Sequence, residues 1–259
     1  MTTERRMIAR WQEGETRQIE DEVIREVPLT VWVNGRELLT LMCQGENVDE
    51  LAVGFLRSEG FLKRREQLKS LKIEEGRVLI EADIDLALLE KLSEKRTVTS
   101  GCGKGTVFYR PLDGLTLTPV TGDALFAPAS ILGRMAELEG RSEVFHRTGG
   151  VHNALLCDSE RTLHLRSDIG RHNAVDMLGG RLFLDGVDAG AHALLVSGRV
   201  SSEILRKCAA FGIGLLVSRS APTTLALDMA QILGVTVVGY ARVNRMNIYT
   251  HPRRVKTGG

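Results

Sequence analysis

The stretch 192–240 decides the fold and reads HALLVSGRVSSEILRKCAAFGIGLLVSRSAPTTLALDMAQILGVTVVGY. Short apolar runs alternate in it with amphipathic runs at helical spacing, a pattern typical of parallel strands covered by helices. The pattern predicts strands over His192–Ser197, Gly214–Ser218 and Val235–Tyr240, and helices over Ser201–Phe211 and Thr223–Leu233. We therefore expect an α/β fold whose sheet in this half of the chain is mixed and largely parallel.

The same alternation begins before this stretch. Val151–Cys157 and Thr162–Arg166 are strand-like, and Asn173–Leu184 has helical spacing. Upstream of them, a proline opens a helix near Ala129–Leu138, which Gly140 ends. The second half of the chain is therefore predicted to form one α/β domain over residues 125–259.

Residues 21–124 are predicted to form a smaller α+β domain. Asn34-Gly35 is a favoured type I′ turn, and it joins the strand-like runs Ile24–Val33 and Glu37–Met42. Asn47 with Glu50 resembles a capping box at the start of a helix. Further expected elements are a hairpin over Leu71–Ile73 and Val78–Ala82, a helix over Leu86–Leu92, and a strand over Leu115–Leu117.

Composition sets the outer limits of the function. The chain has 259 residues, 43% of them hydrophobic and 26% charged, with a formal net charge of +1, so we expect neither nucleic acid nor a membrane as partner. Residues 1–20 are rich in Arg, Glu and Gln without an apolar run, and we interpret them as a flexible tail. The chain holds no apolar run long enough to span a bilayer, and we expect a cytoplasmic location.

The cysteines favour a reducing compartment. The four of them, Cys43, Cys102, Cys157 and Cys208, are irregularly spaced, with no C-x-x-C pair and no Cys/His spacing suited to zinc. We therefore expect no metal site. Cys43, Cys157 and Cys208 lie in apolar strand or helix patterns, where an inert buried thiol is expected.

Cys102 stands apart from the other cysteines because it lies in the glycine-rich loop Thr99–Gly105, TSGCGKG. Glycines at 101, 103 and 105 let consecutive amides turn toward one anion, and Lys104 adds a positive charge, so both favour a thiolate. The alternative is a small apolar filler in a turn. We interpret Cys102 as a reactive sulfur site.

Polar residues gather where the strands of the second half are predicted to end, the place where open α/β sheets bind ligands. Free helix amides and arginines there suit phosphates and a purine edge. Taken singly, each cluster is also consistent with a plain loop or, for Ser220, a helix cap. The candidate binding residues are Arg171, His172, Ser197, Gly198, Arg199, Ser220, Thr223, Tyr240, Ala241, Arg242, Val243, Asn244 and Arg245.

Several nucleotide enzymes are excluded by their motifs. A zinc deaminase needs H-x-E and P-C-x-x-C, but His152-Asn153-Ala154 lacks the glutamate and no C-x-x-C exists. The chain has no Walker lysine motif, no G-x-S-x-G elbow and no G-x-G-x-x-G after a first strand. His152 alone is consistent with a hydrogen-bonded core residue as well as with an acid/base.

Taken together, the motifs resemble the FdhD/NarQ family of formate dehydrogenase accessory sulfurtransferases. The resemblance covers nearly the whole chain after the tail. The segments that carry it are VPLT at 27–30, Asn34-Gly35, ELAVGFL at 50–56, SEG at 58–60, SGCG at 100–103, TGGVH at 148–152, DIGRHNAVD at 168–176, SGR at 197–199, SAPT at 220–223 and NIYTHP at 247–252.

The resemblance implies a cytidine-deaminase-like, three-layer cofactor-binding domain over residues 125–259 and a cytoplasmic homodimer. It implies that Cys102 carries a persulfide received from a cysteine desulfurase, and that residues 240–245 bind the bis-molybdopterin guanine dinucleotide form of the molybdenum cofactor. A guanine nucleotide would mimic this ligand. The sulfur would then serve formate dehydrogenase.

Two positions depart from the family pattern. The family usually has C-x-x-C in the sulfur loop, but the position three after Cys102 is Gly105, and Met177 stands where a lysine is expected. A single cysteine still carries a persulfide, whereas resolution by a neighbouring thiol is lost. The alternative function is a cofactor-binding chaperone without sulfur transfer, and a more distant one is an unrelated nucleotide-binding protein.

Overall fold

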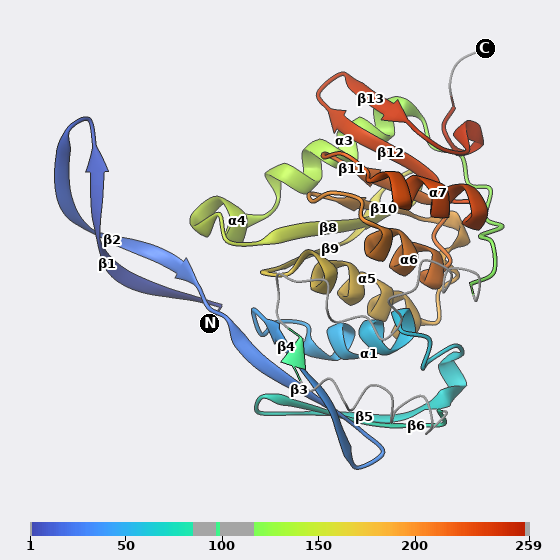
Figure 1. Ribbon diagram of the computed structural model, residues 1–259, viewed down its shortest axis with the longest axis horizontal. Helices are drawn as coiled ribbons and strands as arrows, with labels where there is room; N and C mark the ends of the chain where they lie inside the picture. The colour runs from blue at the N-terminus through green and yellow to red at the C-terminus, as the bar shows by residue number, and fades with distance from the viewer. Residues whose placement is uncertain (1, 85–96, 99–116, 257–259) are drawn as a thin grey trace.

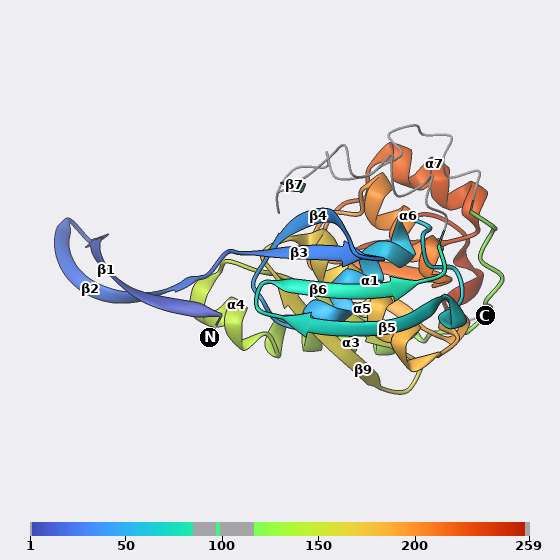
Figure 2. The same cartoon turned by 90° about the horizontal axis from the view of Figure 1, so that it is seen from below.

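The computed structural model describes residues 2–84, 97–98 and 117–256 (Figure 1). The expected helix over Leu86–Leu92 and the Cys102 loop lie outside these residues. Two sheets with their helices are stacked one above the other, and a separate two-stranded hairpin projects from them (Figures 1 and 2).

The C-terminal sheet has six strands in the order β13-β12-β11-β10-β8-β9. Their bounds are β8 His152–Cys157, β9 Thr162–Asp168, β10 Ala193–Val196, β11 Leu215–Ser218, β12 Thr236–Arg242 and β13 Arg245–Ile248. The prediction of a mixed sheet is confirmed, but "largely parallel" is wrong, because only β10-β11 and β11-β12 are parallel pairs. The outer strands are antiparallel because short turns join β8 to β9 and β12 to β13, which turns the chain back on itself.

Helices cover both faces of this sheet, which gives three layers. Helix α3 (Pro128–Gly140) packs on one face, and α5 (Arg171–Asp185), α6 (Ser202–Phe211) and α7 (Thr224–Leu233) pack on the other. The central strands supply both cores by alternation: Leu195 faces α3, whereas Leu194 faces the other helices. The cytidine-deaminase likeness of this arrangement stays a prediction.

The N-terminal sheet has five strands in the order β5-β6-β3-β4-β7, and α1 (Val48–Ser58) covers it. The bounds are β3 Val27–Val33, β4 Arg36–Cys43, β5 Leu68–Glu74, β6 Arg77–Ala82 and β7 Thr97–Val98. The predicted type I′ turn is confirmed, since Asn34 and Gly35 have φ of 50° and 73°. The remaining short elements are α4 Glu143–Thr148, η1 Arg65–Gln67, η3 Ala189–Ala191 and η4 Pro252–Arg254.

Helices α1 and α5 join the two halves at very close range. A Cβ built on Gly54 would lie 1.8 Å from the carbonyl oxygen of Asp176, and one on Gly180 would lie 1.9 Å from that of Glu50. Only glycine permits backbones to approach so closely. The two halves therefore share a backbone-to-backbone contact.

The N-terminal segment differs from the sequence prediction. We expected a flexible tail over residues 1–20, but β1 (Thr3–Gln12) and β2 (Glu15–Ile24) form a regular antiparallel hairpin. No residue described in this hairpin is buried, and Trp11 is 70% exposed. The prediction failed because polar composition without an apolar run is also compatible with a ribbon that lies outside the core.

Three smaller expectations also change. The strand expected over Ile24–Val33 is divided between β2 and β3. Asn47 precedes α1 in a left-handed conformation with no side-chain cap, so the capping box is wrong. Leu117 lies in a bend rather than a strand, and Val120 beyond it packs into the C-terminal core.

Candidate functional site

The carboxyl ends of the strands meet along one edge of the C-terminal sheet. Strands β10, β11 and β12 are parallel, so the loops after Val196, Ser218 and Arg242 lie at the same edge. Strand β9 runs in the same direction, because it is antiparallel to β8, which is antiparallel to β10. The start of α5, which follows β9, therefore lies at this edge too. We call this edge of the sheet the strand-end edge.

Hydrogen bonds fix the loops of the strand-end edge to one another. Ser197 Oγ accepts from the backbone N–H of Asn153 at 3.0 Å. Ser218 Oγ donates to the carbonyl oxygen of Gly198 at 2.7 Å and accepts from Ser220 N at 2.9 Å. The loops after β10 and β11 are therefore held in place before any ligand arrives.

Helix caps account for part of the predicted set. Thr223 is the N-cap of α7, and its side chain accepts from Ala226 N. Ser220 is not a cap, since its carbonyl oxygen instead accepts from Tyr240 N at 3.1 Å. Helix α5 starts after Gly170 without a side-chain cap, so its first amides stay available to an anion.

Two side chains of α5 and α6 meet at this edge. His172 Nε2 lies 3.0 Å from Glu203 Oε2, and both side chains are about one-fifth exposed. The neighbouring His172 side chain lowers the pKa of Glu203, which favours the ionised carboxylate. Glu203 was missed from the sequence because nothing there distinguishes it from an ordinary charge in the first turn of a helix.

His152 also belongs to the strand-end edge. It opens β8, pairs with Asp168 of β9, and lies beside Gly198 and Arg171. Burial lowers the pKa of His152, and Arg171 and His172 lower it further, which favours the neutral imidazole at neutral pH. A neutral imidazole at this position is able to accept a proton.

The turn between β12 and β13 carries the exposed part of the predicted set. Tyr240 and Val243 have positive φ of 52° and 46°, and the strand register shifts between Gly239 and Arg242. The guanidinium of Arg242 lies 5.9 Å from the centre of the Tyr240 ring. Ala241, in contrast, is fully buried in the core under α3, so its side chain is not exposed to a ligand.

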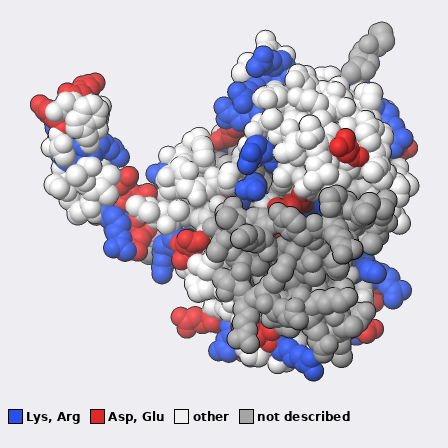
Figure 3. Space-filling view, in the orientation of Figure 1, with Lys and Arg blue, Asp and Glu red and all other residues white. Residues whose placement is uncertain are grey.

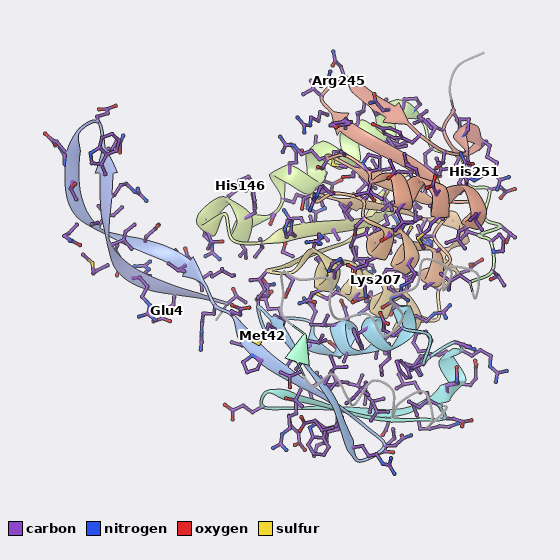
Figure 4. All side chains as sticks on the ribbon, in the orientation of Figure 1. Glu4, Met42, His146, Lys207, Arg245 and His251 are labelled. Atoms are coloured by element: carbon purple, nitrogen blue, oxygen red, sulfur yellow. The ribbon has the colours of Figure 1, made fainter. Side chains whose placement is uncertain are left out.

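Basic side chains gather at this end of the molecule (Figure 3). Arg245 lies at the tip of the β12–β13 turn and points away from the body (Figure 4). Arg199, Arg242 and Asn244 are also exposed, and Arg171 is half-buried. Exposed guanidinium groups beside free helix amides suit the phosphates of a nucleotide.

A separate cavity of about 740 Å³ lies at the C-terminal end of α1. Ser58, Lys63, Pro119 and Gly212 are among the residues that line it, and none of the predicted binding residues does. The strand-end edge remains the candidate site because the predicted side chains meet there and not at the cavity.

The cysteines separate into two groups. Cys102 lies outside the described residues, so its role stays a prediction. Cys43 and Cys157 are buried, and burial raises the pKa of their thiols to about 11 and about 12. Cys208 is fully buried, and burial raises its pKa as well. The prediction of three inert buried thiols is confirmed.

Metal-binding clusters and membrane-spanning helices were the two further features of interest in the described part of the chain. No group of three or more His, Cys, Asp or Glu side chains is placed to hold a metal ion in residues 2–84, 97–98 and 117–256. Within the same part of the chain, no helix is both long and apolar enough to cross a membrane.

The fold and the candidate site define an α/β protein with an arginine-rich strand-end edge. Comparison with known proteins makes the class more specific. The sequence model of the FdhD/NarQ family matches residues 24–256, and the chain therefore belongs to this family.

Relatives and a solved structure resemble the chain over nearly its whole length. The sulfur carrier protein FdhD of Bacillus subtilis is 40% identical and that of Bacillus licheniformis 41%, each over at least 97% of both chains. The crystal structure of a putative formate dehydrogenase accessory protein from Desulfotalea psychrophila has a TM-score of 0.82 at 25% identity. That match covers 98% of this chain and 100% of the other.

Proposed function

We propose that this chain is a sulfur carrier that receives sulfur on Cys102 from a cysteine desulfurase and passes it to the bis-molybdopterin guanine dinucleotide cofactor. The cofactor then serves formate dehydrogenase. The likeness over nearly the full length to proteins named sulfur carrier protein FdhD carries this proposal. The name of the structural neighbour supports the link to formate dehydrogenase.

The described residues next to the Cys102 loop support a shared site. Val98, the last described residue before the loop, pairs with Leu41 of β4. The neighbouring Met42 accepts a hydrogen bond from Asn173 of α5 at 2.8 Å, one residue after His172. The chain therefore enters the loop on the side of the molecule where α5 begins.

The loading step is a thiol exchange. The Cys102 thiolate attacks the terminal sulfur of the donor persulfide, a new S–S bond forms, and the donor cysteine leaves as a thiolate. Release of the carried sulfur as sulfide needs a second thiol, which ends in a mixed disulfide with Cys102. Because position 105 is glycine, that thiol must come from another molecule.

At the strand-end edge, the chain's own residues would hold the nucleotide part of the substrate. Arg242 and Arg245 would contact phosphate, and the first amides of α5 would add uncharged donors. Neutral His152 would accept a proton during transfer. We also propose that the protein is a cytoplasmic homodimer. Light scattering that gave a monomer at micromolar concentration would contradict the dimer.

Persulfide loading tests the sulfur role. After incubation with a cysteine desulfurase and cysteine, intact mass should show one added sulfur on the wild type and none on Cys102→Ser, while Cys157→Ala should load normally. Cys102→Ser should also bind guanine nucleotide and yet fail to restore formate dehydrogenase in cells without their own accessory protein. Full restoration of formate dehydrogenase by Cys102→Ser would instead favour the alternative function, a cofactor-binding chaperone without sulfur transfer.

Calorimetry tests the ligand class. GDP should bind more tightly than ADP, and Arg242→Ala or Arg245→Ala should weaken GDP binding about tenfold, the loss expected for one charge-assisted hydrogen bond. Arg161→Ala is the matched control, because Arg161 is exposed in the β8–β9 turn at the opposite edge of the sheet. Equal binding of GDP and ADP would contradict the assignment.

A further inference from the structure

A carboxylate with no exposed surface joins the two halves beside the candidate site. Asp168, the last residue of β9, accepts through Oδ2 from the backbone N–H of Gln44 at 2.9 Å. Through Oδ1 it accepts from Gly170 N at 3.0 Å and from Asn173 Nδ2 at 2.7 Å. Asp168 is thus bonded to the chain just after β4 and to the first turn of α5.

Asn173 completes the link. Its Nδ2 also donates to the carbonyl oxygen of Met42, the next-to-last residue of β4. Gln44 N–H and the Met42 carbonyl lie on either side of Cys43, so the two bonds fix the backbone at the end of β4 in both position and direction. Strand β7, which leads toward Cys102, pairs with this same strand at Thr40 and Leu41.

We propose that Asp168 and Asn173 are positioning residues that hold the end of β4, and with it β7, against the start of α5 at the strand-end edge. This inference rests on the proposed function, because its purpose is to keep the approach to Cys102 aligned with the bound substrate. Neither side chain needs to touch the substrate.

The chemistry of the Asp168 side chain suits this positioning role. All three partners of Asp168 are N–H donors, so a carboxylate, which only accepts, satisfies each of them. An asparagine at 168 has the same shape but turns one N–H₂ group toward a donor, whichever way the amide is oriented. Asp168→Asn therefore breaks at least one bond of the link while changing the volume very little.

Another contact between the halves supplies a matched control. Arg206 of α6 donates to the carbonyl oxygen of Ser58 at 2.7 Å and to the carboxylate of Glu59, both at the C-terminal end of α1. Arg206→Gln weakens the same interface away from β4 and β7. It separates positioning from general loosening of the two halves.

Transfer assays form the first test. Asp168→Asn and Asn173→Leu should take up sulfur from a cysteine desulfurase and bind GDP like the wild type, but restore formate dehydrogenase activity about tenfold less. Arg206→Gln should restore it normally. Equal restoration by all four proteins would overturn the inference, whereas failure of the wild type to load sulfur would instead contradict the proposed function.

Hydrogen exchange forms the second test and does not depend on sulfur chemistry. In Asp168→Asn, the backbone amides of Gln44 and of Thr97–Val98 should exchange at least several-fold faster, while those of β5 stay unchanged. Arg206→Gln should leave the same amides protected. Unchanged exchange at these amides in Asp168→Asn would overturn the inference even if transfer were impaired.

Discussion

Two of the contacts that join the halves differ in kind. At the C-terminal end of α1, Lys207 Nζ donates to Ser58 Oγ across the two halves at 2.9 Å and is paired within its own half with Asp176, whose carboxylate oxygens lie 2.7 and 2.8 Å away. At the end of β4, a carboxylate instead bonds only to uncharged N–H groups. Paired charges tolerate small shifts, whereas directed bonds to the backbone fix an orientation. The second kind is the one found beside the candidate site.

Between these contacts, the glycine crossing should give the largest effect. In Gly180→Ala, the new Cβ would lie 1.9 Å from the Glu50 carbonyl oxygen, so α1 and α5 must separate. We expect a loss of about 3 kcal/mol or more in the free energy of unfolding, measured by urea denaturation. Gly133→Ala in α3 is the control, since nothing lies within 4 Å of its Cβ. A loss in the control as large as in Gly180→Ala would contradict this explanation.

Removal of Lys207 should come next. Lys207 and Asp176 are 3% and 2% exposed, and Lys207→Met leaves the carboxylate buried without its partner. We expect Lys207→Met to lower the free energy of unfolding by at most about 3–5 kcal/mol. The double variant Lys207→Met/Asp176→Leu should regain the greater part of this loss. Chemical denaturation of the two single variants and the double variant measures this coupling. A double variant no more stable than Lys207→Met would show that the pair contributes net stability.

The carboxylate of Asp168, at the end of β4, should make the free energy of unfolding depend on pH. Burial raises the pKa of Asp168 to about 6, with Glu26 adding repulsion, while bonds from Gln44, Gly170 and Asn173 lower it. The unfolded pKa is about 3.9, so this group's stabilising effect is complete below about pH 4 and is lost as pH rises through 6, about 3 kcal/mol in all.

Asp168→Asn should remove that component of the pH dependence. The stability difference between wild type and variant should therefore shrink as pH rises from 4 to 7, as followed by urea denaturation at each pH. A constant difference would contradict the raised pKa. The expected result would mean that the charged carboxylate costs stability at neutral pH, which agrees with a positioning role rather than a stabilising one.

The smallest effect belongs to an ion pair outside the core. Arg5 and Glu20 lie 3.1 Å apart on the β1–β2 hairpin, with side chains 76% and 54% exposed. Arg5→Ala should change the unfolding free energy by less than about 0.5 kcal/mol, because water screens the pair. A change as large as that of Lys207→Met would show that burial does not explain the contrast.

Local patterns predicted much of the fold. Alternating apolar runs predicted β8 to β12 and their helices, and Asn34-Gly35 predicted the first hairpin of the N-terminal sheet. The direction of the outer strands was not predictable in this way, because apolar runs mark burial and not orientation. The β1–β2 hairpin was missed because its strands bury no face.

The site was predicted in part for a related reason. Arginines and small polar residues after strands reveal themselves in the sequence, and the structure brings those of the C-terminal half to one edge. Contacts between distant segments do not, so Glu203 beside His172 and Asp168 beside Gln44 emerged only in three dimensions. Ala241 was included because it belongs to the segment 240–245, which the family resemblance implied as a whole.

The reactivity of the three buried thiols reports whether the chain is folded. Cys43, Cys157 and Cys208 are protonated and shielded in the native state, and unfolding releases all of them at once. A thiol-directed label should therefore count at most one site on the folded chain and four on the unfolded one. In the proposed sulfur-carrier role, the same shielding would keep these three thiols from accepting sulfur meant for Cys102.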